Sequence, residues 1–224
     1  MERHHFETEL KMLKTRLLNM GALVEERVHQ SIQALMERNP EAAEEIVRGD
    51  QDINELQIEI DDRCLKLLAL QQPMATDLRL ITAAMKINAD LERIGDQAVN
   101  IAENAIKILA APPLKPMIDL PRMAELAEAM TRDSLDAFVR RDSPLARRVL
   151  AQDDEVDQMK DSMFRVLLTY MMADPGTIER ALSLILVSRN LERIADHATN
   201  IAEDVIFLVE AKDVRHRHEE PATP

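Results

Sequence analysis

Apolar residues recur every three or four positions along most of this chain, which is the spacing of one face of an amphipathic α-helix. Charged and polar residues fill the positions between them. This spacing predicts six helices, at about residues 8–38, 41–70, 76–109, 121–140, 144–172 and 177–211. In the first helix the apolar positions are Leu10, Leu13, Leu17, Met20, Val24, Val28, Ile32 and Leu35.

Proline-containing segments separate the predicted helices. Asn39-Pro40 ends the first helix and Gln71-Gln72-Pro73 ends the second, because proline cannot continue a helix from within. The most proline-dense segment, residues 111–116, marks the joint between two halves of three helices each. We therefore predict an all-α fold built from two pseudo-symmetric antiparallel three-helix bundles. The predicted boundaries are 1–112 for the first bundle, 117–212 for the second and 213–224 for a disordered polar tail.

The composition agrees with helix-on-helix packing. Aromatic residues are only 2% of the chain and glycines number four, so little material is available for a sheet with tight turns. Thirteen methionines and the aliphatic residues must fill the core. The single cysteine, Cys64, lies in an apolar helical stretch and is expected to be a small buried hydrophobic residue.

A sixteen-residue segment occurs twice, at 91–106 and 191–206, and eleven of its positions are identical. Two further blocks, 31–35 with 134–138 and 46–54 with 149–157, align at an offset of 103. Such repetition indicates two copies of one structural unit. Four of the identical positions carry side chains with oxygen atoms, namely Glu92/Glu192, Asp96/Asp196, Asn100/Asn200 and Glu103/Glu203.

These oxygen-bearing residues form rows, because residues four apart on a helix lie one above the other. The first row is Glu92, Asp96 and Asn100, and the apolar row Leu91, Ile94, Ala98, Ile101, Ala105 and Ile108 should face the core instead. The second copy repeats the row with Glu192, Asp196 and Asn200. Neighbouring helices supply Asp50 and Asn54 in the first half, and Asp153, Asp157 and Asp161 in the second.

Oxygen ligands on two facing helices are a usual way for a helical bundle to hold a hard cation or a carboxylate-bridged metal cluster. No basic residue lies within these rows, although Arg93 and Arg193 are within reach of Asp96 and Asp196. The alternative is an acidic stripe neutralised by arginine and water. His197 points away from the row and is expected to be a surface residue. The near absence of Cys and His in these segments argues against a zinc site of the nitrogen and sulfur type.

The net charge of −13 argues against a nucleic-acid partner, because no basic patch interrupts the acidic surface. The first ten residues lack the apolar stretch of a signal peptide, and no apolar run is long enough to span a bilayer. We expect a cytoplasmic protein that reaches a membrane only through partners. The chain contains no phosphate-cradling glycine loop, no Ser/His/Asp arrangement and no HExxH motif, so no catalytic or cofactor-binding residue is proposed and an enzyme is not expected.

The paired segments Leu91-Glu-Arg-Ile-Gly-Asp96 and Leu191-Glu-Arg-Ile-Ala-Asp196, each followed by Asn-Ile-Ala-Glu, resemble the signature of the PhoU family. The resemblance covers roughly residues 5 to 212. It implies two three-helix repeats and a cytoplasmic, often dimeric protein. It also implies multinuclear metal clusters of iron, zinc, manganese or magnesium on E/D-x-x-x-D motifs, with the metal in this chain left open.

Position by position, the resemblance assigns metal ligation to Glu92 and Asp96, and to Glu192 and Asp196. Asp153 and Asp157 match the second-helix version of the motif. Asp50 and Asn54 match it less well, because an amide replaces the second carboxylate.

The resemblance also implies a function. Family members act with the ATPase of the phosphate ABC transporter and with a sensor histidine kinase. They keep the phosphate-starvation (Pho) response off when phosphate is plentiful, and they restrain phosphate uptake. Metal-assisted docking to those partners is the expected mechanism. Two alternatives remain: a metal-dependent phosphohydrolase that uses the carboxylate rows for two-metal chemistry, and a purely structural helical adaptor.

Overall fold

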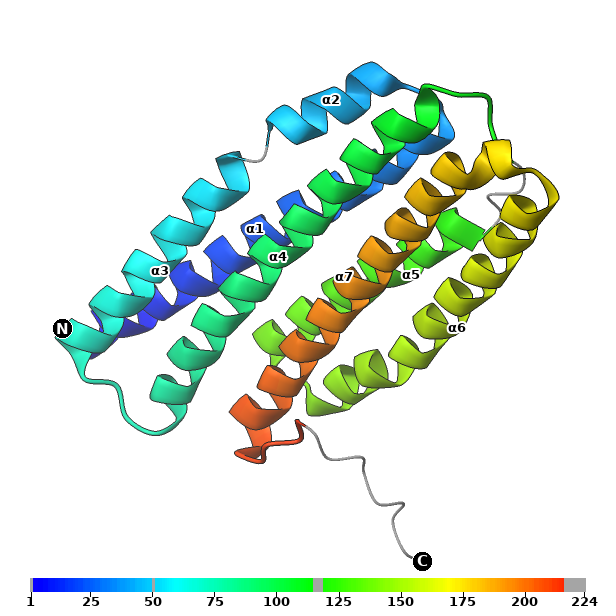
Figure 1. The fold of residues 1–224 in the computed structure, drawn as a ribbon. Helices are drawn as coiled ribbons and strands as arrows, with labels where there is room; N and C mark the ends of the chain where they lie inside the picture. The colour runs from blue at the N-terminus through cyan, green and yellow to red at the C-terminus, as the bar shows by residue number, and fades with distance from the viewer. Residues whose placement is uncertain (1, 50, 115–118, 216–224) are drawn as a thin grey trace, which may run out of the picture.

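The computed structural model describes residues 2–49, 51–114 and 119–215. All regular structure in these residues is helical, and it contains no strand (Figure 1). The elements are α1 (Glu2–Met36), α2 (Pro40–Arg48), α3 (Gln51–Gln71), α4 (Thr76–Leu109), α5 (Asp119–Arg140), α6 (Ser143–Ala173), the 3₁₀ helix η1 (Pro175–Thr177) and α7 (Ile178–Glu210).

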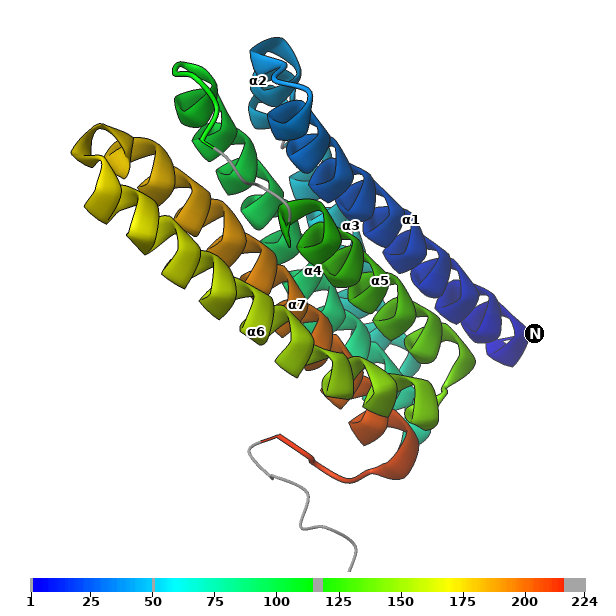
Figure 2. The ribbon, with the colours of Figure 1, turned by 90° about the vertical axis from the view of Figure 1, so that its right-hand side faces the viewer.

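The helices α4 and α7 run antiparallel through the middle of the molecule and pack against each other (Figures 1 and 2). The first repeat adds α1, α2 and α3 around α4, and the second adds α5 and α6 around α7. The α3–α4 and α6–α7 turns therefore lie at opposite ends of the molecule (Figure 1). This arrangement confirms the prediction of an all-α fold made of two pseudo-symmetric three-helix repeats.

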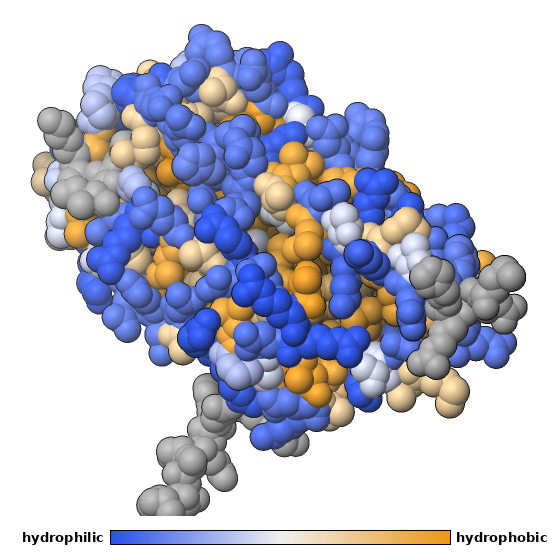
Figure 3. Space-filling model, turned by 180° about the vertical axis from the view of Figure 1, so that it is seen from behind, coloured by the Kyte–Doolittle hydropathy of each residue, from blue (hydrophilic) through white to orange (hydrophobic). Residues whose placement is uncertain are grey.

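The buried apolar side chains of both repeats form one continuous core. Both copies of the predicted apolar row are buried, including Leu91 and Ile94 in α4 and Leu191 and Ile194 in α7. Cys64 is fully buried as expected, and this burial raises the pKa of its thiol to about 12. The face seen from behind is mainly hydrophilic, with a band of hydrophobic residues through its middle (Figure 3).

The turns before α2 and α6 are built alike at equivalent positions of the two repeats. Asn39 Oδ1 accepts a hydrogen bond of 3.0 Å from the backbone N–H of Ala42, and Asp142 Oδ1 accepts one of 2.9 Å from that of Leu145. Each cap satisfies an N–H group that has no partner within its helix. The breaks predicted at Pro40 and before Pro144 are therefore correct.

The second predicted helix, 41–70, is divided into α2 and α3. Gly49 follows α2 and donates its N–H to the carbonyls of Glu45 and Ile46. A Cβ at this glycine would lie only 2.7 Å from Arg27 Nη1, so glycine leaves room for the guanidinium that also bonds the Ile46 carbonyl at 3.4 Å. Arg27 of α1 thus contacts the chain where α2 ends, a contact that local periodicity does not report.

The predicted boundary at 117 falls within residues 115–118, which lie outside the described residues, and the boundaries at 112 and 117 stay a prediction. Of the predicted tail, 213–215 are described, and Val214 is buried there. Residues 216–224 lie outside the described part. Within the described ranges, no helix combines the length and apolar character needed to cross a bilayer.

Candidate cation-binding faces

The acidic rows of α6 and α7 meet in the second repeat and form what we call the second acidic face, made of Asp153, Asp157, Glu192 and Asp196. Asp153 and Asp157 are one turn apart on α6, and Glu192 and Asp196 are one turn apart on α7. The α6–α7 packing brings the two pairs together. The structure thus places Asp153 and Asp157 near Glu192 and Asp196, close enough for their charges to affect one another.

The carboxylates of the second acidic face influence one another. Burial, followed by the negative charges of Asp196 and Asp157, raises the pKa of Asp153 to about 6. Burial, followed by Glu192 and Asp157, also raises the pKa of Asp196. A carboxyl that is half-buried among like charges holds its proton more tightly, and a cation placed among these groups would oppose that effect.

Lys160 already places one positive charge at this face. Its Nζ donates hydrogen bonds to Asp157 Oδ1 at 2.8 Å and to Glu192 Oε1 at 2.9 Å, so the ammonium links α6 to α7. The bond to Asp157 is the main cause that raises the pKa of Lys160. Sequence reasoning weighed the basic residues Arg93 and Arg193 beside the acidic rows of α4 and α7 but missed this lysine on α6. Its position three residues after Asp157 was the signal that could have found it.

The first acidic face consists of Glu92 and Asp96 on α4, with Asn54 and Asp50 expected from the facing helix. Arg93 Nη1 lies 3.2 Å from Asp96 Oδ2, and its Nε lies 3.5 Å from Glu92 Oε2, so the predicted arginine contact is present. Asn54 is half-buried on α3, whereas Asp50 lies outside the described residues. In the described part, α3 therefore offers an amide where α6 offers carboxylates.

Helices α3 and α4 approach closely beside the first acidic face. A Cβ at Gly95 would lie 3.0 Å from Ile53 Cδ1, tighter than an ordinary contact. The second repeat has Ala195 and Val156 at the equivalent positions, both fully buried. Gly95 thus leaves room for Ile53, which is larger than Val156, in the contact between α3 and α4.

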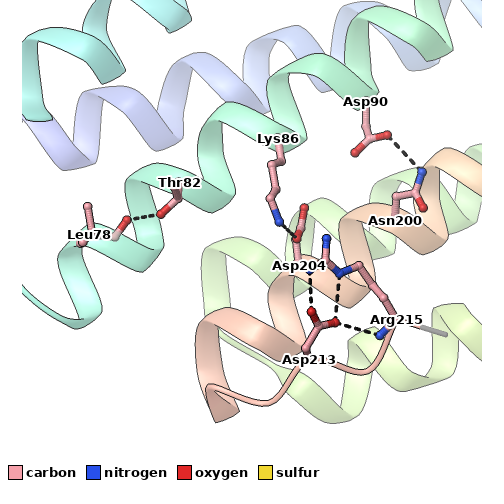
Figure 4. Close-up of polar contacts among 8 residues, drawn as sticks. All are labelled: Leu78, Thr82, Lys86, Asp90, Asn200, Asp204, Asp213 and Arg215. Carbon is pink, nitrogen blue, oxygen red and sulfur yellow. Dashed lines mark hydrogen bonds and ion pairs between the residues drawn. The ribbon is translucent and has the colours of Figure 1, made fainter. Parts of the chain in front are cut away.

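The third member of each predicted row has a different environment. Asn200 Nδ2 donates a hydrogen bond to Asp90 Oδ1 on α4 at 3.3 Å (Figure 4). Asn200 therefore lies at the contact between the two repeats. Asn100 is half-buried, and its backbone carbonyl accepts a hydrogen bond from Asn104 Nδ2. The assignment of both asparagines as metal ligands stays a prediction.

His197 also joins the contact between α4 and α7. Its Nδ1 lies 2.9 Å from Asp90 Oδ1, and only 18% of its side chain is exposed. The expectation of a surface histidine is therefore wrong. The reason is the packing of α7 on α4, which the sequence of one helix does not disclose.

A charged contact of the same interface was also missed from the sequence. Lys86 Nζ on α4 lies 2.7 Å from Asp204 Oδ1 on α7 (Figure 4). The Asp204 side chain is only 8% exposed, and burial raises its pKa although Lys86 opposes this shift. Nearby, Arg215 Nε donates to Asp213 Oδ1 at 2.9 Å, after the end of α7. The Lys86–Asp204 pair links the C-terminal part of α7 to the first repeat.

The donor chemistry of the second acidic face suits a hard cation, since all four ligands offer carboxylate oxygen. Among the described residues, however, no three His, Cys, Asp or Glu side chains surround one point closely enough to hold a metal ion. The ammonium of Lys160 lies between two of the donors. The described structure therefore places a lysine, and not a preformed metal site, among these carboxylates.

The chain was compared with known proteins. The family model described as "PhoU domain" matches it twice, at residues 17–105 and 120–205, one match for each repeat. A phosphate-specific transport system accessory protein PhoU homolog of Aquifex aeolicus (strain VF5) is 44% identical over 210 residues, covering 94% of this chain and 95% of that protein. The protein of that name from Pseudomonas putida is 42% identical and covers 95% of this chain and 85% of that protein.

Two solved structures have the same fold. The crystal structure of PhoU from Pseudomonas aeruginosa superposes with a TM-score of 0.88 at 40% identity, covering 92% of this chain and 100% of that one. The phosphate transport system regulatory protein PhoU from Streptococcus pneumoniae gives a TM-score of 0.87 at 30% identity, covering 93% and 99%. With a family match in each repeat and relatives of the same length and fold, this chain belongs to the PhoU family.

Proposed function

We propose that this chain is an accessory regulator of a phosphate transport system, which keeps the phosphate-starvation response off when phosphate is plentiful and restrains uptake. The observation that carries this proposal is the similarity over both repeats to proteins named accessory or regulatory for phosphate transport. The partners would be the transporter ATPase and a sensor histidine kinase. The protein would act in the cytoplasm, as a homodimer.

The mode of action would be docking and not catalysis. Large apolar side chains with most of their area exposed occur near the helix turns at both ends of the molecule, namely Leu70 and Met74 beside the α3–α4 turn and Met172 at the end of α6. Exposed apolar groups of this kind are common at protein contact surfaces. Assays of phosphate release with Mg²⁺ or Mn²⁺ should accordingly detect no turnover.

The acidic faces would hold a metal cation, of iron, zinc, manganese or magnesium. Asp153, Asp157, Glu192 and Asp196 would be its ligands in the second repeat. Glu92 and Asp96, with Asp50 and Asn54, would serve in the first, and Asn100 and Asn200 would extend the rows. When bound, the cation would neutralise these side chains and join the two helices of each face. Burial is the first cause of the raised pKa values of Asp153 and Asp196, and neighbouring carboxylates add to it, so a bound cation would favour the charged form of both groups.

The test is a phosphate-starvation reporter in phosphate-replete cells that lack the gene. Deletion should switch the reporter on, and the wild-type gene should switch it off again. A variant with alanine at Glu92, Asp96, Glu192 and Asp196 should fail to restore repression if the acidic faces take part. The matched control removes four exposed carboxylates elsewhere, at Glu37, Glu41, Glu45 and Glu179, and should repress normally.

Each outcome of this test has a separate meaning. A reporter that stays off after deletion contradicts the regulatory role itself. If the four-alanine variant restores repression, the regulatory role is supported but the acidic faces take no part in it. That outcome favours the alternative of a purely structural helical adaptor. Immunoblots and thermal unfolding of both variants establish that a loss of repression is not a loss of folded protein.

A further inference from the structure

The outer surface of α6 and α7 carries what we call the apolar strip, a set of large apolar side chains that are 42–79% exposed. They are Phe164, Leu168 and Met172 on α6, and Ile178 and Leu182 on α7. Phe164 lines a pocket of about 240 Å³ between the two helices, and the other residues follow it towards the α6–α7 turn. Soluble proteins rarely leave such a patch uncovered, so the strip indicates contact with another protein surface.

The first repeat has no continuous strip at the equivalent positions. Three of the five positions there hold residues that are not large and apolar, namely Asp61, Ala69 and Thr82. A chain with one self-associating surface forms a closed dimer, whereas two such surfaces would link copies into an open chain. The difference between the repeats therefore fits a partner that is a second copy of this chain.

Two opposite charges stand at the end of the strip that is farther from the α6–α7 turn. Asp161 on α6 and Arg189 on α7 are both exposed and both line the pocket, yet no ion pair joins them in the described structure. The first repeat has the uncharged Ile58 and Ala89 at these positions. The charges are thus a second feature that only the α6–α7 surface has.

The strip and the two charges are self-complementary. A two-fold axis that runs along the groove between α6 and α7 places α6 of one copy against α7 of the other at the same height. Leu168 then packs against Leu182 of the second copy, and Asp161 faces Arg189 of the second copy. Each contact occurs twice, as in any isologous interface, and the four helices pack as in a bundle. Opposite charges at the rim favour this orientation over others.

We propose that two copies of this chain associate through the apolar strip, with the two-fold axis along the α6–α7 groove. This inference rests on the homodimer named under the proposed function and identifies the surface that forms it. The exposed apolar residues of α6 and α7 are then covered in the dimer. The equivalent surface of α3 and α4 stays free for other contacts.

The first experiment measures association by light scattering and sedimentation equilibrium. The wild-type protein should have twice the chain mass of 25.5 kDa. Leu168→Glu places a charge in the middle of the strip and should raise the dissociation constant at least about a hundredfold. The matched control is Leu65→Glu, the same substitution at the equivalent exposed leucine of α3, which should associate as the wild type does. Thermal unfolding establishes that both variants are folded.

A second experiment tests the orientation and does not depend on a loss of association alone. Asp161→Arg gives a chain with arginine at both rim positions, and Arg189→Asp gives one with aspartate at both. Each variant alone should associate more weakly than the wild type, because like charges face each other. An equimolar mixture should form a mixed dimer, since every contact across the axis is then between opposite charges. A mixture that associates no better than its components would overturn the proposed orientation.

The failures of the two proposals are distinguishable. If the wild-type protein is a monomer, the homodimer of the proposed function fails together with this inference. If Leu168→Glu associates as well as Leu65→Glu and the wild type, the homodimer stands and the apolar strip is not its surface. The regulatory role is decided in either case by the reporter experiment.

Discussion

The two repeats carry the same motif on α4 and α7 but neutralise it differently. In the first repeat, Arg93 lies on the same helix as the carboxylates that it contacts, and 62% of its side chain is exposed. In the second repeat, Lys160 comes from the facing helix and is much less exposed. An identical motif therefore does not determine the electrostatics of its surroundings, because the neighbouring helix contributes half of each face.

The contact between α4 and α7 shows the same difference between the repeats. Lys86 and Asp204 form an ion pair across it, whereas the equivalent positions hold the neutral residues Leu186 and Asn104. Asn104 is buried and uses its Nδ2 for the Asn100 carbonyl. The apolar rows of α4 and α7 are buried alike, whereas the Lys86–Asp204 pair has no charged counterpart at the equivalent positions.

The largest expected effect comes from replacing the lysine of this ion pair while its aspartate is kept. Lys86→Leu copies the second repeat but leaves the Asp204 carboxylate buried without its lysine. A buried charge without a partner is costly, because its desolvation is no longer compensated. The free energy of unfolding at pH 7 should therefore fall by about 2–3 kcal/mol. Urea unfolding of protein that has been freed of metal by a chelator measures this change in the free energy of unfolding.

The control is the double variant Lys86→Leu with Asp204→Asn, which reproduces the neutral pair and should recover most of the loss.

The pH dependence gives a second check. An acid whose folded pKa is raised stabilises the folded state below its unfolded pKa and loses that contribution as pH rises through the folded pKa. The deficit of Lys86→Leu should therefore shrink as pH falls from 7 towards about 4. A deficit independent of pH would assign the effect to packing.

A smaller effect is expected where α3 and α4 approach beside the first acidic face. Gly95→Ala copies Ala195 of the second repeat, but the new Cβ meets Ile53 at 3.0 Å. Overpacking should outweigh the gain in helix propensity and lower the free energy of unfolding by about 1 kcal/mol. Adding Ile53→Val, the residue type found at Val156, should restore stability. If the single variant is already as stable as the wild type, Ile53 has adjusted freely and the proposed constraint is absent.

The fold was predictable from the sequence because its determinants are local or repeated. Apolar residues three or four apart located the helices, and the two copies of the motif located the pseudo-symmetry. The division of the second helix was not predictable. Arg27 of α1 contacts the chain where α2 ends, and apolar periodicity does not report such a contact between residues distant in sequence.

The candidate site was predictable only in part, for a similar reason. The i, i+4 spacing identified Glu192 and Asp196 as a row, and the structure brings Asp153 and Asp157 to face them. The spacing of Lys160 from Asp157 could have indicated the first of its two contacts, whereas its bond to Glu192 depends on how α6 packs against α7. The contact of His197 with Asp90 depends likewise on how α7 packs against α4.

The smallest expected effect tests whether the first face depends on its arginine. Arg93→Gln removes contacts of 3.2 and 3.5 Å with Asp96 and Glu92, but these lie in water-exposed surroundings. Exposed ion pairs contribute about 0.5 kcal/mol or less and weaken with salt, so the free energy of unfolding should change by no more than that and the change should vanish at about 1 M salt. Lys160→Gln, measured without metal, should destabilise the protein more and respond less to salt, because Lys160 is more buried and joins two helices. Equal losses for both variants would mean that the two faces are neutralised equivalently, which would remove the difference between the repeats.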